Sequence, residues 1–262
     1  MANGLKVVSR RPLDRRDLSA RLVTLTAILG DGRRNMDTSL RRAWTEVVTP
    51  EDYERHMAAV GQAQAAAALT RSLVQAAHLS PGDRLEVVGA GTGQMLDFLD
   101  PDLLRPFRLV FSDLNPRFLE VLRTRLADHR LEGTVVEDDI EKTKLAPHAD
   151  LVLASLLLEH LDWKEGVKAL AGMHPGACGI VLQENPPGMA SAVTPGRPLP
   201  PSMAEAMAFA HPVLVPKDRL IEAMDQAGYR CRFTESVSVA DGKRLVGLLF
   251  ESRRNPKLRT ES

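Results

Sequence analysis

Three glycines lie close together in the segment Gly89-Ala90-Gly91-Thr92-Gly93, directly after the apolar run 85–88. Glycine adopts positive φ without strain, so glycines after a first parallel strand form a tight turn that lets the backbone approach a ligand closely. The sixth position is Gln94, so the spacing is GxGxG and departs from the GxGxxG of dinucleotide-binding strands. A tight strand-to-helix turn without a ligand is the alternative interpretation.

Acidic side chains follow the next two apolar runs of the sequence. Asp113 comes twenty residues after Gly93, and a carboxylate there can accept hydrogen bonds from both hydroxyls of a ribose. The third run ends in Glu137-Asp138-Asp139-Ile140, where a carboxylate can accept from an adenine amino group. Ligands of open parallel sheets bind at the carboxyl ends of the strands, so these segments predict one nucleoside-binding site.

Alternating strands and helices must position these residues. Strands are expected over 84–88, 107–112, 134–137, 150–154, 178–183, 230–239 and 244–252, and helices over 13–29, 49–77, 94–99, 116–129, 156–173, 202–210 and 217–228. This alternation predicts a parallel sheet covered on both faces, and the turn chemistry at 240–243 predicts a closing hairpin. The expected fold class is a three-layer α/β domain with a seven-stranded, mostly parallel sheet, a closing antiparallel hairpin and an N-terminal helical cap.

The glycine segment, Ser112-Asp113-Leu114-Asn115-Pro116 and Leu158-Glu159-His160-Leu161 together resemble the motifs of class I, Rossmann-like S-adenosylmethionine-dependent methyltransferases. The resemblance covers about 80–252 and includes the closing hairpin. It implies that S-adenosylmethionine is the cofactor and S-adenosylhomocysteine the product. The implied cofactor-binding residues are Gly89, Ala90, Gly91 and Gly93 around the methionine part, Asp113 at the ribose, Leu114, Asp139 (or Asp138) and Ile140 at the adenine, and Ser155 and Leu156 near the sulfonium.

One position departs from the family's pattern. The family often has an acidic residue two positions before the first glycine, and this chain has Val87 there, with Glu86 one step earlier. Because neighbouring side chains of a strand point to opposite faces, Glu86 replaces the missing carboxylate only if a bulge intervenes.

Three places offer contacts for a methyl acceptor. Glu159 and His160 follow the fourth strand and are the candidate catalytic residues, with packing or capping as the alternative for His160. Glu184 and Asn185 follow the fifth strand, where a plain strand-to-loop exit is the alternative. Tyr53, His56 and Met57 share one face of the expected helix 49–77, a stripe that also suits a core. No metal ligands are expected.

The expected domains are an N-terminal helical cap (1–79), a methyltransferase domain (80–252) and a C-terminal tail (253–262). A proline-rich lid (186–216) is inserted after the fifth strand, because unusually long loops often cover functional sites. A surface excursion with one helix is its alternative. Met189, Met203, Met207 and Phe209 of the lid can form an adaptable apolar wall over a small molecule.

Composition limits the classes of partner. The chain of 262 residues carries 34 Lys+Arg, 34 Asp+Glu and two cysteines. This balance disfavours nucleic acid as a partner, and the sequence has no apolar run that could span a membrane. The paired counts hide a basic segment: residues 1–43 hold ten bases and four acids, a surplus of 10 − 4 = 6. With two cysteines in no motif, a cytoplasmic location is expected, and a homodimer is left open.

The expected function is methyl transfer from S-adenosylmethionine to an O or N nucleophile of a small-molecule metabolite. One alternative is a nucleic-acid methyltransferase that uses the basic segment 1–43 as its grip. Another is a catalytically inactive regulatory protein that binds the adenosyl cofactor, for which Val87 is mild support. An NAD-dependent oxidoreductase is a third, although the GxGxG spacing and the closing hairpin count against it.

Overall fold

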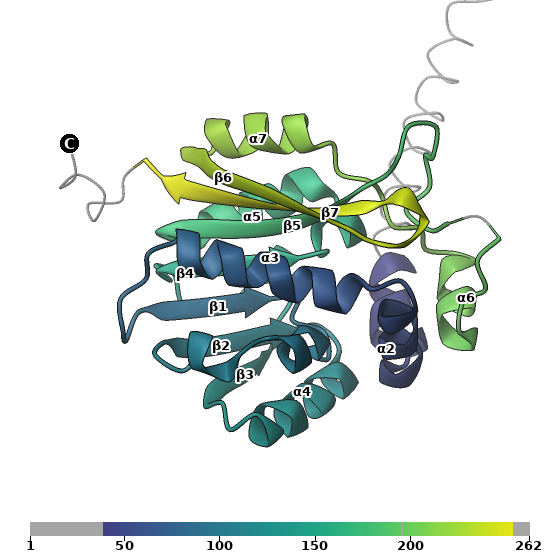
Figure 1. Ribbon diagram of the computed structural model, residues 1–262, viewed down its shortest axis with the longest axis horizontal. Coiled ribbons are helices and arrows are strands. Elements are labelled where there is room, and N and C mark those ends of the chain that lie inside the picture. Colours follow the sequence, from purple (N-terminus) through teal and green to yellow (C-terminus); the bar gives the residue numbers. More distant parts are fainter. Residues whose placement is uncertain (1–38, 195, 254–262) are drawn as a thin grey trace, which may run out of the picture. The chain divides into compact units, whose positions relative to one another are not determined.

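The computed structural model describes residues 39–194 and 196–253. Its centre is a seven-stranded sheet in the order β3-β2-β1-β4-β5-β7-β6 (Figure 1). The strands are β1 Arg84–Val88, β2 Arg108–Asp113, β3 Gly133–Glu137, β4 Leu151–Ser155, β5 Ala177–Glu184, β6 Tyr229–Ser238 and β7 Arg244–Ser252. β7 is antiparallel to both of its neighbours, and the remaining pairs are parallel. The predicted sheet, with its closing hairpin, is therefore confirmed.

Helices cover both faces of the sheet. They are α2 Pro50–Ala59, α3 Gln62–Ala76, α4 Pro116–Asp128, α5 Trp163–Gly172, α6 Pro201–Met207 and α7 Lys217–Gln226, with the short helices η1 Ala43–Val47, η2 Gln94–Phe98, η3 Pro101–Leu103, η4 Ile140–Lys142, η5 Leu158–His160 and η6 Ala240–Gly242. α3 and α4 bury their apolar sides against one face of the sheet, and α5 and α7 bury theirs against the other. The apolar strand residues alternate between these two cores, as the period of a strand requires.

Three expected helices differ from the observed ones. The helix expected over 49–77 is broken at Gly61, which has φ +70° and separates α2 from α3. The helix expected over 156–173 begins only at Trp163, because Asp162 caps α5 by accepting from Lys164 N–H. The turn after the glycines is the 3-10 helix η2 rather than an α-helix.

The described part of the cap packs against the lid. Residues from Ser39 onward form one compact unit. An apolar cluster joins Ala43 and Val48 of the cap to Met203 and Met207 of the lid. The first turns of α2 and α6 are also linked: Thr49 N–H donates to Ser202 Oγ (3.1 Å), and Ser202 N–H donates to Asp52 Oδ2 (2.8 Å). Figure 1 shows α2 and α6 beyond the carboxyl ends of the parallel strands.

Some expectations fall on other parts of the chain. The helix 13–29, most of the basic segment 1–43 and residues 254–262 of the tail lie outside the described residues.

Candidate active site

The cofactor loop, residues 89–93, follows β1 and depends on its glycines. Gly89, Gly91 and Gly93 have φ of +63°, +58° and +69°, which L side chains rarely adopt. A Cβ on Gly89 would lie 2.7 Å from Leu157 Cδ1, and one on Gly91 would lie 3.4 Å from the Tyr53 hydroxyl oxygen. The loop is therefore tightly covered by the segment after β4 on one side and by α2 of the cap on the other.

Asp113 at the end of β2 shapes this loop. Its Oδ2 accepts from Gly91 N–H at 2.8 Å and its Oδ1 accepts from Asn115 N–H at 2.9 Å. Burial raises the pKa of Asp113, and the N–H groups of Asn115, Gly91 and Leu114 work against this rise. A carboxylate held in this way is preorganised at the carboxyl end of its strand, where the sequence predicted a ribose-binding group.

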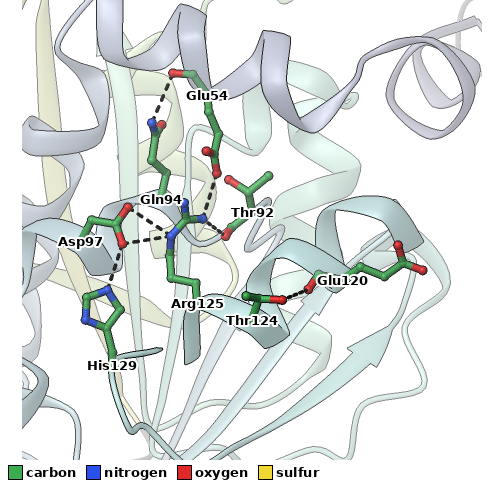
Figure 2. Close-up of polar contacts among 8 residues, drawn as sticks. All are labelled: Glu54, Thr92, Gln94, Asp97, Glu120, Thr124, Arg125 and His129. Carbon is green, nitrogen blue, oxygen red and sulfur yellow. Dashed lines mark hydrogen bonds and ion pairs between the residues drawn. The ribbon is translucent and has the colours of Figure 1, made fainter. Parts of the chain in front are cut away.

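An arginine of α4 joins the cofactor loop to the cap (Figure 2). The Arg125 guanidinium donates to the Thr92 carbonyl, pairs with Glu54 Oε1 at 2.9 Å and bonds both oxygens of Asp97 at 3.0 and 3.1 Å. Gln94 Nε2 in turn donates to the Glu54 carbonyl at 3.2 Å. This network fixes α2 over the loop, and no sequence motif pointed to it.

The acidic pair after β3 is engaged unequally. Asp139 Oδ2 accepts from Arg41 of the cap at 2.5 Å, and its Oδ1 accepts from Glu141 N–H at 3.1 Å. Asp138 Oδ1 accepts from Lys144 N–H at 2.8 Å, whereas its buried Oδ2 has no hydrogen-bond partner among the described residues. Ile140 is buried in the core between the sheet and α5, and Leu114 is half-buried beside Asp113.

Glu86 does not face the cofactor loop. It is fully buried and forms an ion pair with Arg84, two residues earlier on the same face of β1. β1 pairs with β2 and β4 in unbroken register, so no bulge turns Glu86 toward the position of Val87.

The end of β4 carries a backbone outlier. Leu156 has φ +53°, an uncommon conformation for a residue other than glycine that is found most often at functional sites. Its N–H donates to Val181 of β5 at 2.9 Å, and Ser155 before it pairs in register with the same residue. The sharp turn at Leu156 places the following residues beside the cofactor loop, since Leu157 covers Gly89.

A pocket, called here the cap–lid pocket, lies next to the cofactor loop. The cap supplies Trp44, Tyr53, His56, Met57, Val60 and Gln62, and the strand ends supply Leu156, Glu159, His160 and Gln183; the lid supplies Ala192, Val193, Thr194, Arg197, Met203, Met207 and Pro212, and the hairpin supplies Val239, Ala240, Asp241 and Lys243. Tyr53 borders both the pocket and Gly91. Burial, then Asp113 and Glu54, raise the pKa of this phenol above its usual value.

Glu159 brings a carboxyl group with one open oxygen to this pocket. Its side chain is 3% exposed. Its Oε1 accepts from Gln183 N–H at 2.8 Å, while its buried Oε2 has no hydrogen-bond partner among the described residues. Burial raises the pKa of Glu159 to about 7, although the Gln183 N–H opposes the rise. A carboxyl group in this state can take up a proton near neutral pH.

His160 is held by the cap. Trp44 Nε1–H donates to His160 Nδ1 at 3.2 Å, and the two rings meet edge to face with centroids 4.5 Å apart. Burial lowers the pKa of His160 to about 4, so the imidazole is neutral at physiological pH. Because Nδ1 accepts a hydrogen bond, the ring proton resides on Nε2, which is then a donor.

The two candidates after β5 do not line the pocket. Glu184 pairs with Arg244 at 2.6 Å and with Lys217 at 3.4 Å. Asn185 donates from Nδ2 to the Met189 and Ser191 carbonyls and accepts from Gln183 Nε2. Gln183 is the pocket residue of this segment, because neighbouring strand residues face opposite ways.

Sequence reasoning singled out Tyr53, His56 and Met57, which the structure brings together with Glu159 and His160. It missed Trp44, Gln183, Arg197, Asp241 and Lys243. Trp44 could have been found as one of the chain's two tryptophans. Asp241 and Lys243 stand in a segment that was read only as a hairpin turn. In the lid, Met203 and Met207 line the pocket, whereas Met189 and Phe209 do not.

Membrane-spanning helices and clusters of metal ligands are absent from the described residues. Within them, no helix is both long and apolar enough to cross a membrane. No group of three or more His, Cys, Asp or Glu side chains in the same residues is placed to hold a metal ion.

Comparison with known proteins gives the class of domain. Residues 87–175 match a family model described as a methyltransferase domain. No curated protein matches the chain. The matched range holds the cofactor loop, Asp113, Asp139 and Glu159, which are the candidate residues at the carboxyl ends of β1 to β4.

Solved structures share the fold at low identity. Magnesium protoporphyrin IX methyltransferase from Synechocystis PCC 6803, with bound S-adenosylhomocysteine, is 12% identical over 73% of this chain and 83% of its own, with a TM-score of 0.56. Phosphoethanolamine N-methyltransferase 2 from Haemonchus contortus, in complex with phosphomonomethylethanolamine and S-adenosylhomocysteine, is 12% identical over 69% and 51%, at 0.51. The [4+2]-cyclase SpnF is 13% identical over 70% and 80%, at 0.52. At such identities these likenesses establish the fold alone.

Proposed function

We propose that this chain, a class I S-adenosylmethionine-dependent methyltransferase by its methyltransferase domain and its fold, methylates an oxygen or nitrogen atom of a small molecule. The observation that carries the proposal is the cap–lid pocket, which is lined by Glu159, whose buried Oε2 has no hydrogen-bond partner among the described residues, and by Leu156, next to the Leu157 that covers the cofactor loop. The pocket is walled by cap, lid and hairpin, and such enclosure suits a metabolite better than a macromolecule.

The residues present fit S-adenosylmethionine, whose sulfonium supplies an electrophilic methyl group when it is bound. Gly89, Gly91 and Gly93 adopt positive φ and so form the tight turn after β1, with Ala90 among them, and we assign this loop to the methionine part. Asp113 is assigned to the ribose hydroxyls, since its carboxylate is already fixed by two backbone N–H groups. Ser155 and Leu156 are assigned to the neighbourhood of the sulfonium.

The adenine contacts are assigned to Leu114, Ile140 and one of the acids after β3. Asp139 is the first choice because it lies two residues after the end of β3 and faces the cap, where Arg41 already binds it. Asp138 is the alternative because its Oδ2 is buried without a partner in the described part of the chain. Separate Asp138→Asn and Asp139→Asn variants distinguish the two by the affinity for S-adenosylhomocysteine.

Glu159 is assigned as the proton acceptor for the nucleophile. With a pKa of about 7, about half of the carboxyl groups are ionised at neutral pH and ready to accept a proton as the nucleophile attacks. His160, neutral and with its proton on Nε2, is assigned as a hydrogen-bond donor that orients the acceptor. Tyr53, His56 and Met57 are assigned to acceptor binding, and Glu184 and Asn185 to the support of the lid, since neither lines the pocket.

Three further assignments belong to the same proposal. We assign three parts to the chain: a cap (1–79), a methyltransferase domain (80–252) with the lid (186–216) inserted in it, and a tail (253–262). The acceptor is assigned as a small molecule, and one structural neighbour is in complex with a small molecule, phosphomonomethylethanolamine. The compartment is the cytoplasm, which suits the free thiols of Cys178 and Cys231. A nucleic-acid acceptor would have to use the basic segment 1–43, and a regulatory protein would bind the cofactor without transfer.

Calorimetry with S-adenosylmethionine, S-adenosylhomocysteine and NAD tests the cofactor. We expect both adenosyl ligands to bind and NAD not to bind. Release of S-adenosylhomocysteine in the presence of pooled small-molecule nucleophiles, but not of RNA or DNA, tests the acceptor class. Methylation of RNA that depends on residues 1–43 would support the nucleic-acid alternative instead. Binding of both adenosyl ligands without transfer to any acceptor would support the regulatory one.

A further inference from the structure

Positive charge is in surplus at the hairpin end of the cap–lid pocket. Lys243 and Arg197 line the pocket there together with one carboxylate, Asp241. Arg197 binds that carboxylate in a bidentate manner, from Nε to Oδ2 at 2.9 Å and from the terminal nitrogen to Oδ1 at 2.7 Å. The Thr194 hydroxyl also donates to Asp241 Oδ2, at 2.7 Å. Asp241 is therefore fully engaged by its neighbours.

Lys243 is left with little compensation for its charge. The residue is 7% exposed. The one hydrogen bond that its ammonium makes among the described residues goes to the Ala192 carbonyl oxygen, at 2.6 Å. An ammonium has three N–H donors, and a buried cation is costly unless an anion pairs with it. Burial accordingly lowers the pKa of Lys243; Asp241 works against this and Arg197 adds to it.

His56 adds a donor to this end of the pocket but no charge. Burial lowers its pKa below the ordinary value, and the positive charges of Arg197 and Lys243 lower it further. Two cations therefore face one carboxylate, which leaves a surplus of one positive charge. One negative charge balances it, so the site suits a carboxylate better than a doubly charged phosphate.

The other residues that line the pocket indicate which kind of molecule carries the anion. Met57, Met203 and Met207 also line the pocket, and thioether side chains adapt to an apolar body. Glu159, whose buried Oε2 has no hydrogen-bond partner among the described residues, lies on η5 after β4, whereas Lys243 lies in the hairpin before β7. The pocket thus has a cationic group and a proton acceptor on separate elements, together with apolar side chains.

We propose, building on the function proposed above, that the methyl acceptor is a carboxylic acid with an apolar body, whose carboxylate binds the Lys243 ammonium. The atom that is methylated is then a second group of the same molecule, an oxygen or nitrogen that reaches the Glu159 carboxyl. Lys243 is in this view a specificity-determining residue, because a neutral analogue would leave its ammonium buried without an anion.

Matched acids and amides test the carboxylate directly. Benzoate, phenylacetate and octanoate are titrated by calorimetry against benzamide, phenylacetamide and octanamide, with and without saturating S-adenosylhomocysteine. We expect at least one acid to bind about tenfold or more tighter than its amide, the size of one charge-assisted hydrogen bond. Equal binding of acids and amides, or no binding of any acid, overturns the proposal. Inorganic phosphate that competes better than the acids overturns the choice of carboxylate.

Substitutions of Lys243 test whether this residue causes the preference for an acid over its amide. Lys243→Gln should lose the preference for the acid, while Lys168→Gln, which changes an exposed lysine of α5 that does not line the pocket, should keep it. Lys243→Met, which retains the stem, serves if Lys243→Gln does not fold, and Lys243→Arg should restore the preference. A preference that survives both neutral variants contradicts the proposal.

The test separates this inference from the function on which it builds. The titrations measure binding and need no methyl transfer. Selective binding of acids through Lys243 without release of S-adenosylhomocysteine from any hydroxy or amino acid analogue would leave the anion site standing and refute the transfer. Equal methylation of hydroxy acids and their amides would support methyl transfer and refute the carboxylate site.

Discussion

The cofactor loop and the cap–lid pocket lie side by side at the strand ends, and they differ in how their charged groups are paired. Around the loop, the charged groups bind protein atoms: Asp113 accepts from two backbone N–H groups and Arg125 pairs with Glu54 and Asp97. Two neutral atoms there, Thr92 Oγ1 and Gln94 Oε1, have no hydrogen-bond partner among the described residues. In the pocket, Glu159 Oε2 has no such partner in the same residues and the Lys243 ammonium binds a single carbonyl. The charged groups beside the loop are thus held by the protein, whereas those of Glu159 and Lys243 keep hydrogen-bonding capacity for a ligand.

The largest effect is expected from a substitution of Glu159 in the pocket. Glu159→Gln should reduce the rate of methyl transfer about 100-fold to 10,000-fold, the range that a general base contributes. The affinity for S-adenosylhomocysteine should stay unchanged, because Glu159 belongs to the pocket. The wild-type rate should rise with pH up to about 7, the pKa of Glu159, and then level off; in the variant this rise should be absent. An identical pH profile in both proteins would contradict the assignment.

The same residue gives a stability signature. The folded-state pKa of Glu159 lies above its ordinary value of 4.5, so the folded protein binds more protons than the unfolded one between these two values. The contribution of Glu159 to the free energy of unfolding should therefore fall as pH rises from 4.5 to about 7. Thermal unfolding of Glu159→Gln should lack this loss and gain on the wild type toward pH 8.

The role of the cofactor loop is tested by a substitution of Asp113. Asp113→Ala removes a carboxylate that fixes the loop and is assigned to the ribose, so the affinity for S-adenosylhomocysteine should fall about 100-fold, the effect of losing two charge-assisted hydrogen bonds. The control is Asp128→Ala, an exposed aspartate at the end of α4. Calorimetry measures both variants. Unchanged affinity in Asp113→Ala would show that the ribose lies elsewhere.

Arg125 tests whether the loop and the cap are coupled. Arg125→Gln leaves the buried Glu54 Oε1 and the Thr92 carbonyl without their cation, which should cost about 1–3 kcal/mol of unfolding free energy. Denaturant unfolding measures this loss, and binding of S-adenosylhomocysteine should weaken in parallel. Arg123→Gln, exposed on the same helix, is the matched control. Equal effects of the two substitutions would mean that the network in Figure 2 adds nothing specific.

The smallest effect is expected at Trp44. Trp44→Phe keeps the aromatic packing but removes the N–H that donates to His160 Nδ1. One hydrogen bond of this kind is worth about 1 kcal/mol, so the rate should fall about fivefold. Trp163→Phe on α5, where the ring meets Lys164 rather than His160, should have no such effect. If Trp44→Phe weakened the binding of S-adenosylhomocysteine without lowering the rate, Trp44 would support the cofactor loop and not the pocket.

The two halves also differ in how far the sequence predicts them. The strands were predicted to within one residue because short apolar runs alternate with turn residues, and the expected fold is confirmed. The glycine and Asp113 segments lie within the range 87–175 that matches a methyltransferase domain. The helix 49–77 was wrong because Gly61, read as an interior position, adopts positive φ. The assignments of individual cofactor-loop residues stay predictions.

The pocket was only half visible in the sequence because its walls come from segments far apart in the chain. Helical spacing identified Tyr53, His56 and Met57, since neighbours on one helix face are fixed locally. Lys243 was missed because its burial depends on the lid, whose Ala192 carbonyl accepts from it. Gln183 was missed because it was predicted to be the last residue of the fifth strand, and the sequence alone does not tell which face of β5 meets the pocket.

The junction between α2 and α6 has a consequence for the timing of ligand exchange. Ser202 both donates to Asp52 and accepts from Thr49, and the apolar cluster of Ala43, Val48 and Met203 lies against the same junction. If a ligand leaves past this junction, two hydrogen bonds and a packed apolar cluster must open together. Its residence time would then depend on how often α2 and α6 separate, and substitutions at Thr49 or Ser202 would shorten it without touching Lys243 or the cofactor loop.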